Sequence, residues 1–360
     1  MTAVPDLYQP LIEKLTRCRR VLVTTHVRPD GDAVGTAAAM VLGLRHKGID
    51  AHVLLLSKLP PKYEFVFREA NVAHTEIDSA WPANLSLDDF DALLVVDTGT
   101  WNQLPILADR AKNWPRPKLV LDHHLTQENW ADAKVVVTQA AAAGEIAADL
   151  LQAWGVPMDA ALANAIFLAI VSDTGWFQFS NTRPATLLLA ARLMEAHVDT
   201  DHLYQILYQS ERAERLKLQT RAQDSLQLLA NDRLAVMTLS VDDFRATGGK
   251  VSDTENVINV PLQIGTVEVS LLFTDPPDRK ADDPIRVSLR SKGQIDVARF
   301  AEQFGGGGHA RAAGLKLPGT LEQVRTRVVD AMTASMQTSA KAPESHATPQ
   351  PTLTSIGGLP

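Results

Sequence analysis

The first half of the chain alternates short apolar runs with segments of helical periodicity. The apolar runs are VLVTT (21–25), AHVLLL (51–56), ALLVVD (92–97), KLVLD (118–122) and AKVVV (133–137). Such runs, without alternating polar positions, are typical of strands buried on both faces, as in a parallel sheet covered by helices. Helical periodicity follows at 141–154, 158–171 and 184–197, the last with Pro184 near its first turn. We therefore expect residues 1–198 to form an α/β domain with a parallel sheet.

The pattern changes after residue 198. Residues 199–229 are charged, contain neither glycine nor proline, and carry apolar positions at helical spacing, which predicts a helical linker. Strand patterns and two helices, near 295–304 and 320–336, then predict a smaller α+β domain over residues 230–336. Residues 337–360 hold four prolines and little apolar material, which predicts a disordered tail.

Composition narrows the class of protein. Hydrophobic residues make up 45% of the chain and charged residues 21%, as in a globular protein. A net charge of -7 argues against a broad footprint for long duplex nucleic acid but leaves short anionic ligands open. A single cysteine, Cys18, excludes an intramolecular disulfide and a thiolate zinc cluster. Without a signal-peptide pattern or an apolar run of roughly 18 residues, the sequence predicts a cytoplasmic protein that does not enter the membrane.

Three of the apolar runs end in polar residues. His26 follows the first run, Asp97 ends the third, and Asp122, His123 and His124 end KLVLDHH. If these strands are parallel neighbours, all five side chains lie at the carboxyl edge of the sheet, where open α/β folds bind their ligands.

Three more acids belong to the same group. VRPDGDAVG (27–35) places Asp30 and Asp32 on a turn ahead of a helix, although an Asp in this position is commonly only a helix cap. VSDTGWF (171–177) ends a helical segment at Asp173 and turns at Gly175, which is also compatible with a purely structural helix end.

Together these residues predict a metal site. Four carboxylates cannot lie together ionised without countercharge, and two divalent cations would supply it. Carboxylate and imidazole ligands without thiolate favour Mn²⁺ or Mg²⁺, while Co²⁺, Fe²⁺ and Zn²⁺ stay open. We expect Asp97 to bridge the two ions, which then activate water against a phosphate ester. The predicted ligands are His26, Asp30, Asp32, Asp97, His123 and Asp173.

A glycine-rich segment, FGGGGHARAAG (304–314), stands out in the second domain. Four glycines in a row are often only a flexible linker. Here His309 and Arg311 follow them, and Arg290 lies on a strand that we expect nearby. Backbone N–H groups of such a turn, together with arginine, can bind phosphate. The candidate substrate-binding residues are therefore Arg290, Gly306, Gly307, Gly308, His309 and Arg311.

The motifs THVRPDGDAVG, VVDTG, LDHH and SDTG occur in the order of the four motifs of the DHH phosphoesterases, which this sequence resembles. SLRSKG and GGGGHARAAG resemble the DHH-associated C-terminal domain of that family. The resemblance covers about residues 10 to 335 and implies two Mn²⁺ ions held by the six predicted ligands. It also implies that Asp122 orients an imidazole and that His124 lies near the scissile phosphate.

The compact length is similar to that of the nanoRNase subgroup. Its members hydrolyse very short RNA and remove phosphate from 3′-phosphoadenosine 5′-phosphate (pAp), so the resemblance implies these substrates, and it also implies a homodimer. A cyclic-dinucleotide phosphodiesterase and a single-strand exonuclease of the same family stay open. From another class, a non-catalytic nucleotide-binding regulatory module would be favoured by loss of an acid from the cluster, and none is missing.

Overall fold

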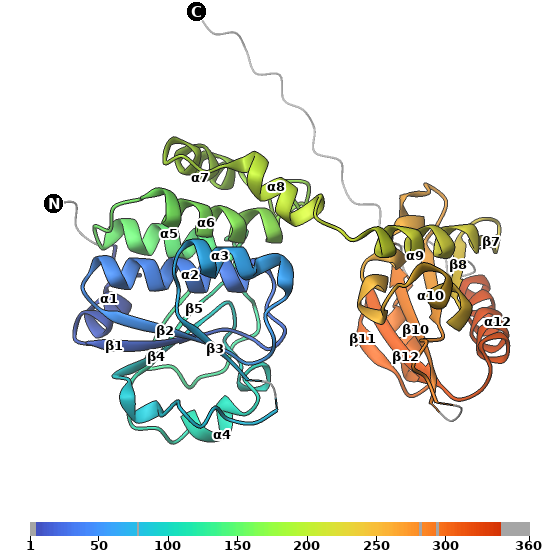
Figure 1. The fold of residues 1–360 in the computed structure, drawn as a ribbon, viewed down its shortest axis with the longest axis horizontal. Coiled ribbons are helices and arrows are strands. Elements are labelled where there is room, and N and C mark those ends of the chain that lie inside the picture. Colours follow the sequence, from blue (N-terminus) through green and yellow to red (C-terminus); the bar gives the residue numbers. More distant parts are fainter. Residues whose placement is uncertain (1–4, 78, 281–282, 293–294, 340–360) are drawn as a thin grey trace, which may run out of the picture. The chain divides into compact units, whose positions relative to one another are not determined.

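The computed structural model describes residues 5–77, 79–280, 283–292 and 295–339 (Figure 1). The chain divides into two compact units, Met1–Ser210 and Glu211–Pro360. Each unit contains one sheet of six strands.

The strands of the first unit are all parallel and lie in the order β3-β2-β1-β4-β5-β6. They are β1 (Arg20–Thr24), β2 (Asp50–Leu55), β3 (His74–Glu76), β4 (Ala92–Val96), β5 (Lys118–Asp122) and β6 (Ala133–Val136). Five of them match the predicted apolar runs, and the parallel sheet is confirmed. The additional strand, β3, has the sequence HTE, which contains no apolar residue and therefore gave no strand pattern.

Helices cover both faces of this sheet (Figure 1). They are α1 (Gln9–Thr16), α2 (Gly31–His46), α3 (Glu64–Glu69), α4 (Leu107–Ala111), α5 (Ala143–Ala153), α6 (Ala160–Asp173), α7 (Pro184–Glu195) and α8 (Thr200–Tyr208), with 3₁₀ turns at Pro61–Tyr63, Leu87–Asp89 and Trp101–Gln103. Helices α2, α5 and α6 share one core with one face of the sheet, while α4 and the Trp101 segment cover the other face.

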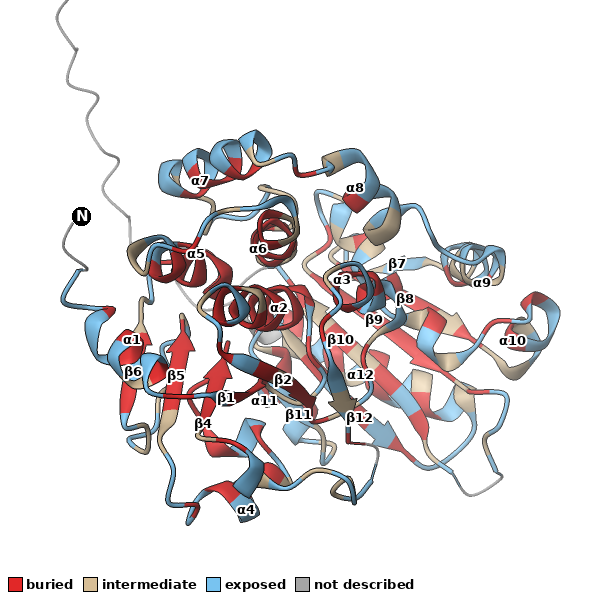
Figure 2. Cartoon of the chain, turned by 60° about the vertical axis from the view of Figure 1, so that its left-hand side comes forward, coloured by how far each residue is buried: buried red, intermediate tan, exposed pale blue. Residues whose placement is uncertain are grey.

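Helix α2 lies between the sheet and α6 and is buried along most of its length (Figure 2). Its Gly35 approaches α6 so closely that a Cβ atom there would lie 2.4 Å from the carbonyl oxygen of Ala165. A glycine is required at this contact, and the contact brings the first turn of α2 close to the last turn of α6.

The second unit contains a mixed sheet in the order β11-β12-β10-β9-β8-β7. Its elements are α9 (Ala213–Asp224), β7 (Gln227–Leu229), β8 (Leu234–Leu239), α10 (Val241–Thr247), β9 (Val269–Thr274), β10 (Ile285–Ser291), α11 (Val297–Glu302), β11 (Gly307–His309), β12 (Ala312–Leu317) and α12 (Leu321–Ser339), with 3₁₀ segments at Val251–Thr254 and Val257–Gln263. Strands β8 and β9 are parallel, and the other pairs are antiparallel.

One face of this sheet packs on α11 and α12. On the other face, α9 and α10 cover the strands β8 and β9. The part of the second face that lies over β10, β12 and β11 carries half-buried and exposed residues instead. The α+β character of the second unit is confirmed.

The structure corrects two boundaries. Residues 199–229 do not form one helical linker, because the helix is interrupted at 209–212 and β7 follows α9. Helix α8 packs on the first unit through Leu203, and α9 packs on the second through Leu218 and Ala222. The spacing of apolar residues shows that a helix has an apolar face, but it does not show on which hydrophobic core that face packs. The predicted tail starts too early, since α12 continues to Ser339, and residues 340–360 lie outside the described part.

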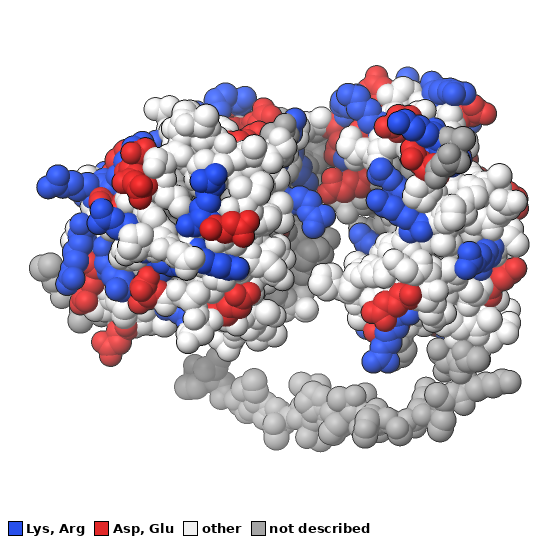
Figure 3. Space-filling model, turned by 90° about the horizontal axis from the view of Figure 1, so that it is seen from below, with Lys and Arg blue, Asp and Glu red and all other residues white. Residues whose placement is uncertain are grey.

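Charges of both signs are interspersed on the face of each unit that Figure 3 shows. Among the described residues, no helix combines the length and the apolar character that a membrane span requires.

Candidate metal centre

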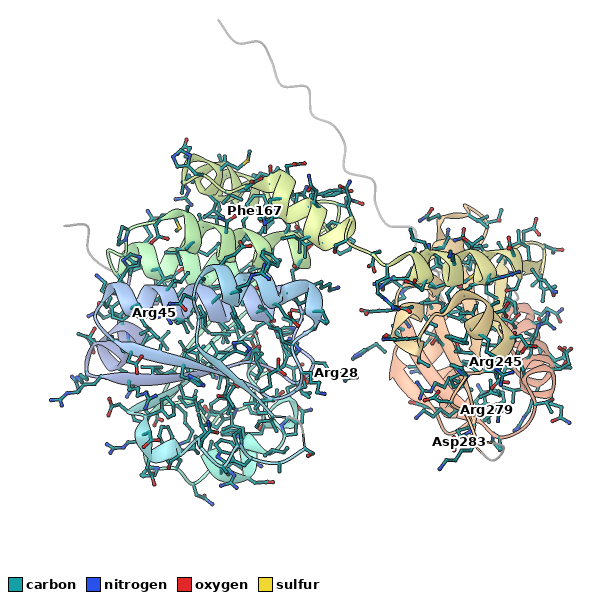
Figure 4. The ribbon with its side chains drawn as sticks, in the orientation of Figure 1. Arg28, Arg45, Phe167, Arg245, Arg279 and Asp283 are labelled. Atoms are coloured by element: carbon teal, nitrogen blue, oxygen red, sulfur yellow. The ribbon has the colours of Figure 1, made fainter. Side chains whose placement is uncertain are left out.

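The carboxyl edge of the first sheet carries the polar residues that end the strands. Strands β1, β4 and β5 are neighbours, so His26, Asp97 and His123 emerge side by side just beyond their ends. Figure 4 shows Arg28, from the first motif, at the edge of the unit where β1 ends.

The remaining acids come from two helix ends. Asp30 is the N-cap of α2 and accepts a hydrogen bond from the Ala33 amide, so it does serve as the helix cap that its position before the helix suggests. Asp32 lies in the first turn of the same helix, and Asp173 is the last residue of α6. Because α2 packs against α6, these two acids lie close together beside His123.

The two oxygens of Asp97 face different imidazoles. Its Oδ1 atom lies 3.4 Å from Nε2 of His123, and its Oδ2 atom lies 3.4 Å from Nε2 of His26. On the first side, His123 Nε2 is also 3.4 Å from Asp173 and 3.7 Å from Asp32. On the second side, His26 Nε2 is 3.9 Å from Asp30.

These contacts define two groups of ligand atoms that can each hold an ion, with Asp97 between them. One group is His26, Asp30 and Asp97, the other is Asp32, His123 and Asp173, and His124 forms a third combination with Asp97 and His123. Asp97 Oδ1 and His123 Nε2 are buried without a hydrogen-bond partner of acceptable geometry. Buried polar atoms are rarely left so, and bound cations would satisfy them. The residues therefore fit a metal pair.

Without ions the acids and imidazoles perturb one another. Burial opposes the charged imidazoles, but the neighbouring carboxylates, Asp97 first, outweigh it and raise the pKa of His26 to about 9 and that of His123 to about 10. Burial, with the charges of Asp97 and Asp30, raises the pKa of Asp173 to about 7. Burial also raises the pKa of Asp32, and the negative charge of Asp97 raises it further.

Asp97 differs because both imidazoles stabilise its charge. Burial acts against the carboxylate, yet His123 and His26 lower its pKa below the ordinary value. Its backbone is in the left-handed region, with φ 59°, a conformation that costs energy for a residue with a side chain and is enriched at functional sites. This turn directs the carboxylate between the two groups.

The segment 140–144 supports two of the predicted ligands, and Asn181 links it to a third. The Ala140 carbonyl oxygen lies 3.2 Å from Nδ1 of His123, so Nε2 points to the acids. The Ala143 and Gly144 amides donate to Asp32 at 2.6 and 3.0 Å. Asn181, which the sequence did not single out, donates to the carbonyl oxygens of Ala141 and Asp173.

Glu145 anchors this segment and was also missed. Its buried carboxylate accepts hydrogen bonds from the Ala141 amide, from the Thr186 hydroxyl and from Arg183. An acid in an alanine-rich stretch was the available signal, but nothing local indicates that two of its partners lie about 40 residues away.

Asp122 faces His124 and lies beside the two ligand groups without belonging to either. Its Oδ1 atom is 2.8 Å from Nδ1 of His124, and this contact, together with Asp97, raises the pKa of His124 despite partial burial. The Gln127 amide donates to the other oxygen of Asp122. The contact leaves Nε2 as the free ring nitrogen of His124, whose side chain is 54% exposed.

In the second unit, the glycine-rich segment forms part of a β-hairpin. Gly307–His309 form β11, which pairs with β12. The φ of Gly308 is 145°, and a Cβ there would lie 2.4 Å from the Ala312 carbonyl oxygen. Gly306 is as tightly placed, whereas nothing lies within 4 Å of a Cβ on Gly307.

The strand register places Arg290 and His309 on one face of the second sheet. Both lie opposite Ala312, on either side of it. Arg311 is exposed in the turn between β11 and β12, and burial lowers the pKa of Arg290. Lys292, which follows β10, donates hydrogen bonds to the carbonyl oxygens of Leu262 and Ile264. The arrangement places cationic groups beside a row of glycines.

Two family models match the chain. Residues 20–170 match the DHH family, N-terminal domain, and residues 231–338 match the DHHA1 domain. The chain is 26% identical over 315 residues to the bifunctional oligoribonuclease and PAP phosphatase NrnA of Thermus thermophilus, covering 87% of this chain and 89% of that protein. It is 26% identical over 340 residues to the cyclic-di-AMP phosphodiesterase PdeA of Listeria monocytogenes, covering 91% of this chain but 49% of the relative.

A solved structure shares the fold of both units. An exopolyphosphatase-related protein from Bacteroides fragilis matches with a TM-score of 0.81 at 20% identity, over 95% of this chain and 99% of that one. The two family matches show that the chain contains a DHH family N-terminal domain followed by a DHHA1 domain.

Proposed function

We propose that the chain is a manganese-dependent hydrolase of very short oligoribonucleotides that also converts pAp to AMP. The observation that carries the proposal is the position of Asp97, whose two oxygens face two separate ligand groups. The similarity to NrnA over most of both chains supports the substrates. Carboxylate and imidazole ligands without thiolate support Mn²⁺, with Mg²⁺ or Co²⁺ as substitutes.

The proposed ligands are His26, Asp30, Asp32, Asp97, His123 and Asp173, with Asp97 shared. When bound, two divalent cations lower the pKa of water and neutralise charge on the phosphate during in-line displacement. Asp32 and His123 are held for this role by the amides and the carbonyl oxygen of segment 140–144. These hydrogen bonds orient both side chains towards the other proposed ligands.

His124 is the proposed proton donor to the leaving oxygen. Asp122 stabilises the protonated ring through Nδ1 and leaves Nε2 to face the substrate. Asp122 is fully buried, and the His123 and His124 amides donate to the same oxygen that faces the ring. Its carboxylate is therefore placed to orient His124 and does not reach the substrate itself.

The second unit is the proposed substrate-binding domain. Arg290, His309 and Arg311 are proposed to hold a phosphate of the substrate, with the backbone of Gly306, Gly307 and Gly308 close to it. Glycine at these positions allows a phosphate to approach the chain, and an arginine guanidinium can donate two hydrogen bonds to it.

A second candidate is hydrolysis of a cyclic dinucleotide. The similarity to PdeA favours it, although this chain spans about half of that relative. A cyclic dinucleotide and a linear dinucleotide present the same phosphodiester, so the metal residues do not separate the two. The difference must lie in how the substrate's other groups are bound.

Hydrolysis rates of the purified protein with Mn²⁺ test the proposal. We expect a dinucleotide and pAp to be hydrolysed faster than a long RNA or cyclic di-AMP. Asp97→Ala should abolish hydrolysis, and Asp109→Ala, which removes an exposed acid on α4, should not change it. Equal rates for Asp97→Ala and the unaltered protein would refute the metal-bridge assignment, and faster hydrolysis of cyclic di-AMP would favour the second candidate.

A further inference from the structure

Two large apolar side chains are exposed on chain segments that continue directly from the predicted metal ligands. Leu125 directly follows His124 and is 86% exposed. Phe179 is 58% exposed and follows Asp173 by six residues. His123 lies 3.4 Å from Asp173, so the two apolar residues continue the chain from neighbouring parts of the cluster. Both side chains offer an exposed apolar surface to a ligand.

Phe179 is held in place by an unusual turn. Gly175, Trp176 and Phe177 all have positive φ, at 55°, 58° and 66°. This conformation is unfavourable for tryptophan and phenylalanine, and such strain concentrates where function requires it. The turn folds the chain back, and the Phe179 amide donates to the Thr174 carbonyl oxygen at 3.0 Å.

Aromatic packing stabilises this turn. The Trp176 ring packs edge-on against Tyr204, with centroids 5.0 Å apart, and the Phe177 ring packs in the same way on Phe167 at 6.0 Å. Figure 4 labels Phe167, which is buried on α6. Phe177 is therefore tied to the core, while Phe179, two residues later, is left exposed.

The ring of Phe179 lies directly against Gly175. A Cβ atom on Gly175 would be 2.5 Å from the ring, so a side chain there would displace the ring. One side of the ring is thus covered by backbone, and its exposed surface is available to a planar ligand. The ring is placed within a short stretch of chain from the Asp173 carboxylate.

We propose that Phe179 and Leu125 contact the nucleobase attached to the phosphate that is hydrolysed, with Phe179 stacking on it. This inference rests on the proposed function and adds to it the recognition of the base. The acids and imidazoles account for a phosphate but offer no surface to a base. Stacking on an aromatic ring accepts any base, so this contact selects nucleotides over other phosphate esters without selecting a sequence.

The test compares a dinucleotide with an analogue that lacks the base at the hydrolysed end. In the unaltered protein the abasic analogue should have the higher KM. Phe179→Ala should raise the KM for the dinucleotide about tenfold and leave the KM for the abasic analogue unchanged. Leu125→Ala should act in the same direction, and Phe179→Tyr should retain most of the affinity.

Leu188→Ala is the matched control, because Leu188 is 67% exposed and lies on α7, which carries none of the proposed ligands. It should leave both KM values unchanged. Equal effects of Phe179→Ala on both substrates, or no effect on either, would refute the base contact. If the unaltered protein hydrolyses neither substrate with Mn²⁺, the proposed function itself fails. Mn²⁺ titration of each variant shows whether the cluster is intact.

Discussion

The carboxylate of Asp122 lies 2.8 Å from Nδ1 of His124 at the end of β5. The same oxygen accepts hydrogen bonds from the amides of His123 and His124. Asp122 therefore holds the backbone turn and the ring together, and the ring nitrogen that remains free is Nε2. Asp122 therefore orients His124, whereas the six predicted ligands would contact the metals.

Asp122→Asn should lower kcat roughly 10- to 100-fold, because the neutral amide keeps the shape but no longer stabilises a protonated His124. Mn²⁺ affinity should change much less, since Asp122 belongs to neither ligand group. Steady-state kinetics on a dinucleotide and a Mn²⁺ titration measure the two effects. An unchanged kcat would remove Asp122 and His124 from the proton-transfer role.

Glu145→Gln should destabilise the first unit by about 2 kcal/mol, because it leaves Arg183 and the Ala141 amide without their carboxylate partner. Partial exposure of Arg183, at 38%, keeps this value below that of a fully buried pair. Urea unfolding measures the loss.

The same variant should weaken Mn²⁺ binding, since segment 140–144 contacts His123 and Asp32. Arg68→Ala, which removes an exposed ion pair with Glu69, is the control and should have little effect on either measurement. Normal Mn²⁺ affinity in Glu145→Gln would show that the ligands keep their positions without this anchor.

Burial of the Cys18 thiol, together with the charge of Asp91, raises its pKa to about 11. At pH 8 the folded protein should react with a thiol reagent about a hundredfold more slowly than the urea-unfolded chain, whose thiol ionises near its ordinary pKa. Because the folded state binds this proton more tightly, its contribution to stability is present below about pH 9 and is lost as the pH rises towards 11. Equal rates in the two states would contradict the burial.

The apolar runs predicted most of the first sheet because a strand buried on both faces must be apolar throughout its length. The same reasoning could not find β3, which is three residues long and contains no apolar residue. It also joined α8 and α9, because helical spacing continues across 209–212 although the two helices pack on different cores.

The clustering of the predicted ligands was predictable for a topological reason, since parallel neighbouring strands place their ends at one edge. Their supporting residues were not. Asn181 and Glu145 act through carbonyl and amide groups far away in the chain, and single side chains in alanine-rich or polar segments do not indicate such partners. Glycine gives no strand signal, so the sequence does not indicate that this run contains β11, although Gly306 and Gly308 are fixed by backbone packing.

Substitutions at Gly307 and Gly308 distinguish a structural role of the glycines from a role in substrate binding. Gly308→Ala should disrupt the hairpin, because its Cβ would lie 2.4 Å from the Ala312 carbonyl oxygen and its φ of 145° is unfavourable for alanine. Gly307→Ala should leave the hairpin folded, since its Cβ meets nothing within 4 Å. If substrate phosphate approaches the backbone there, the added methyl group should still raise KM with no change in melting temperature. Calorimetry and kinetics on pAp distinguish the cases, and a Gly307→Ala protein with unchanged KM would show that substrate does not reach this strand.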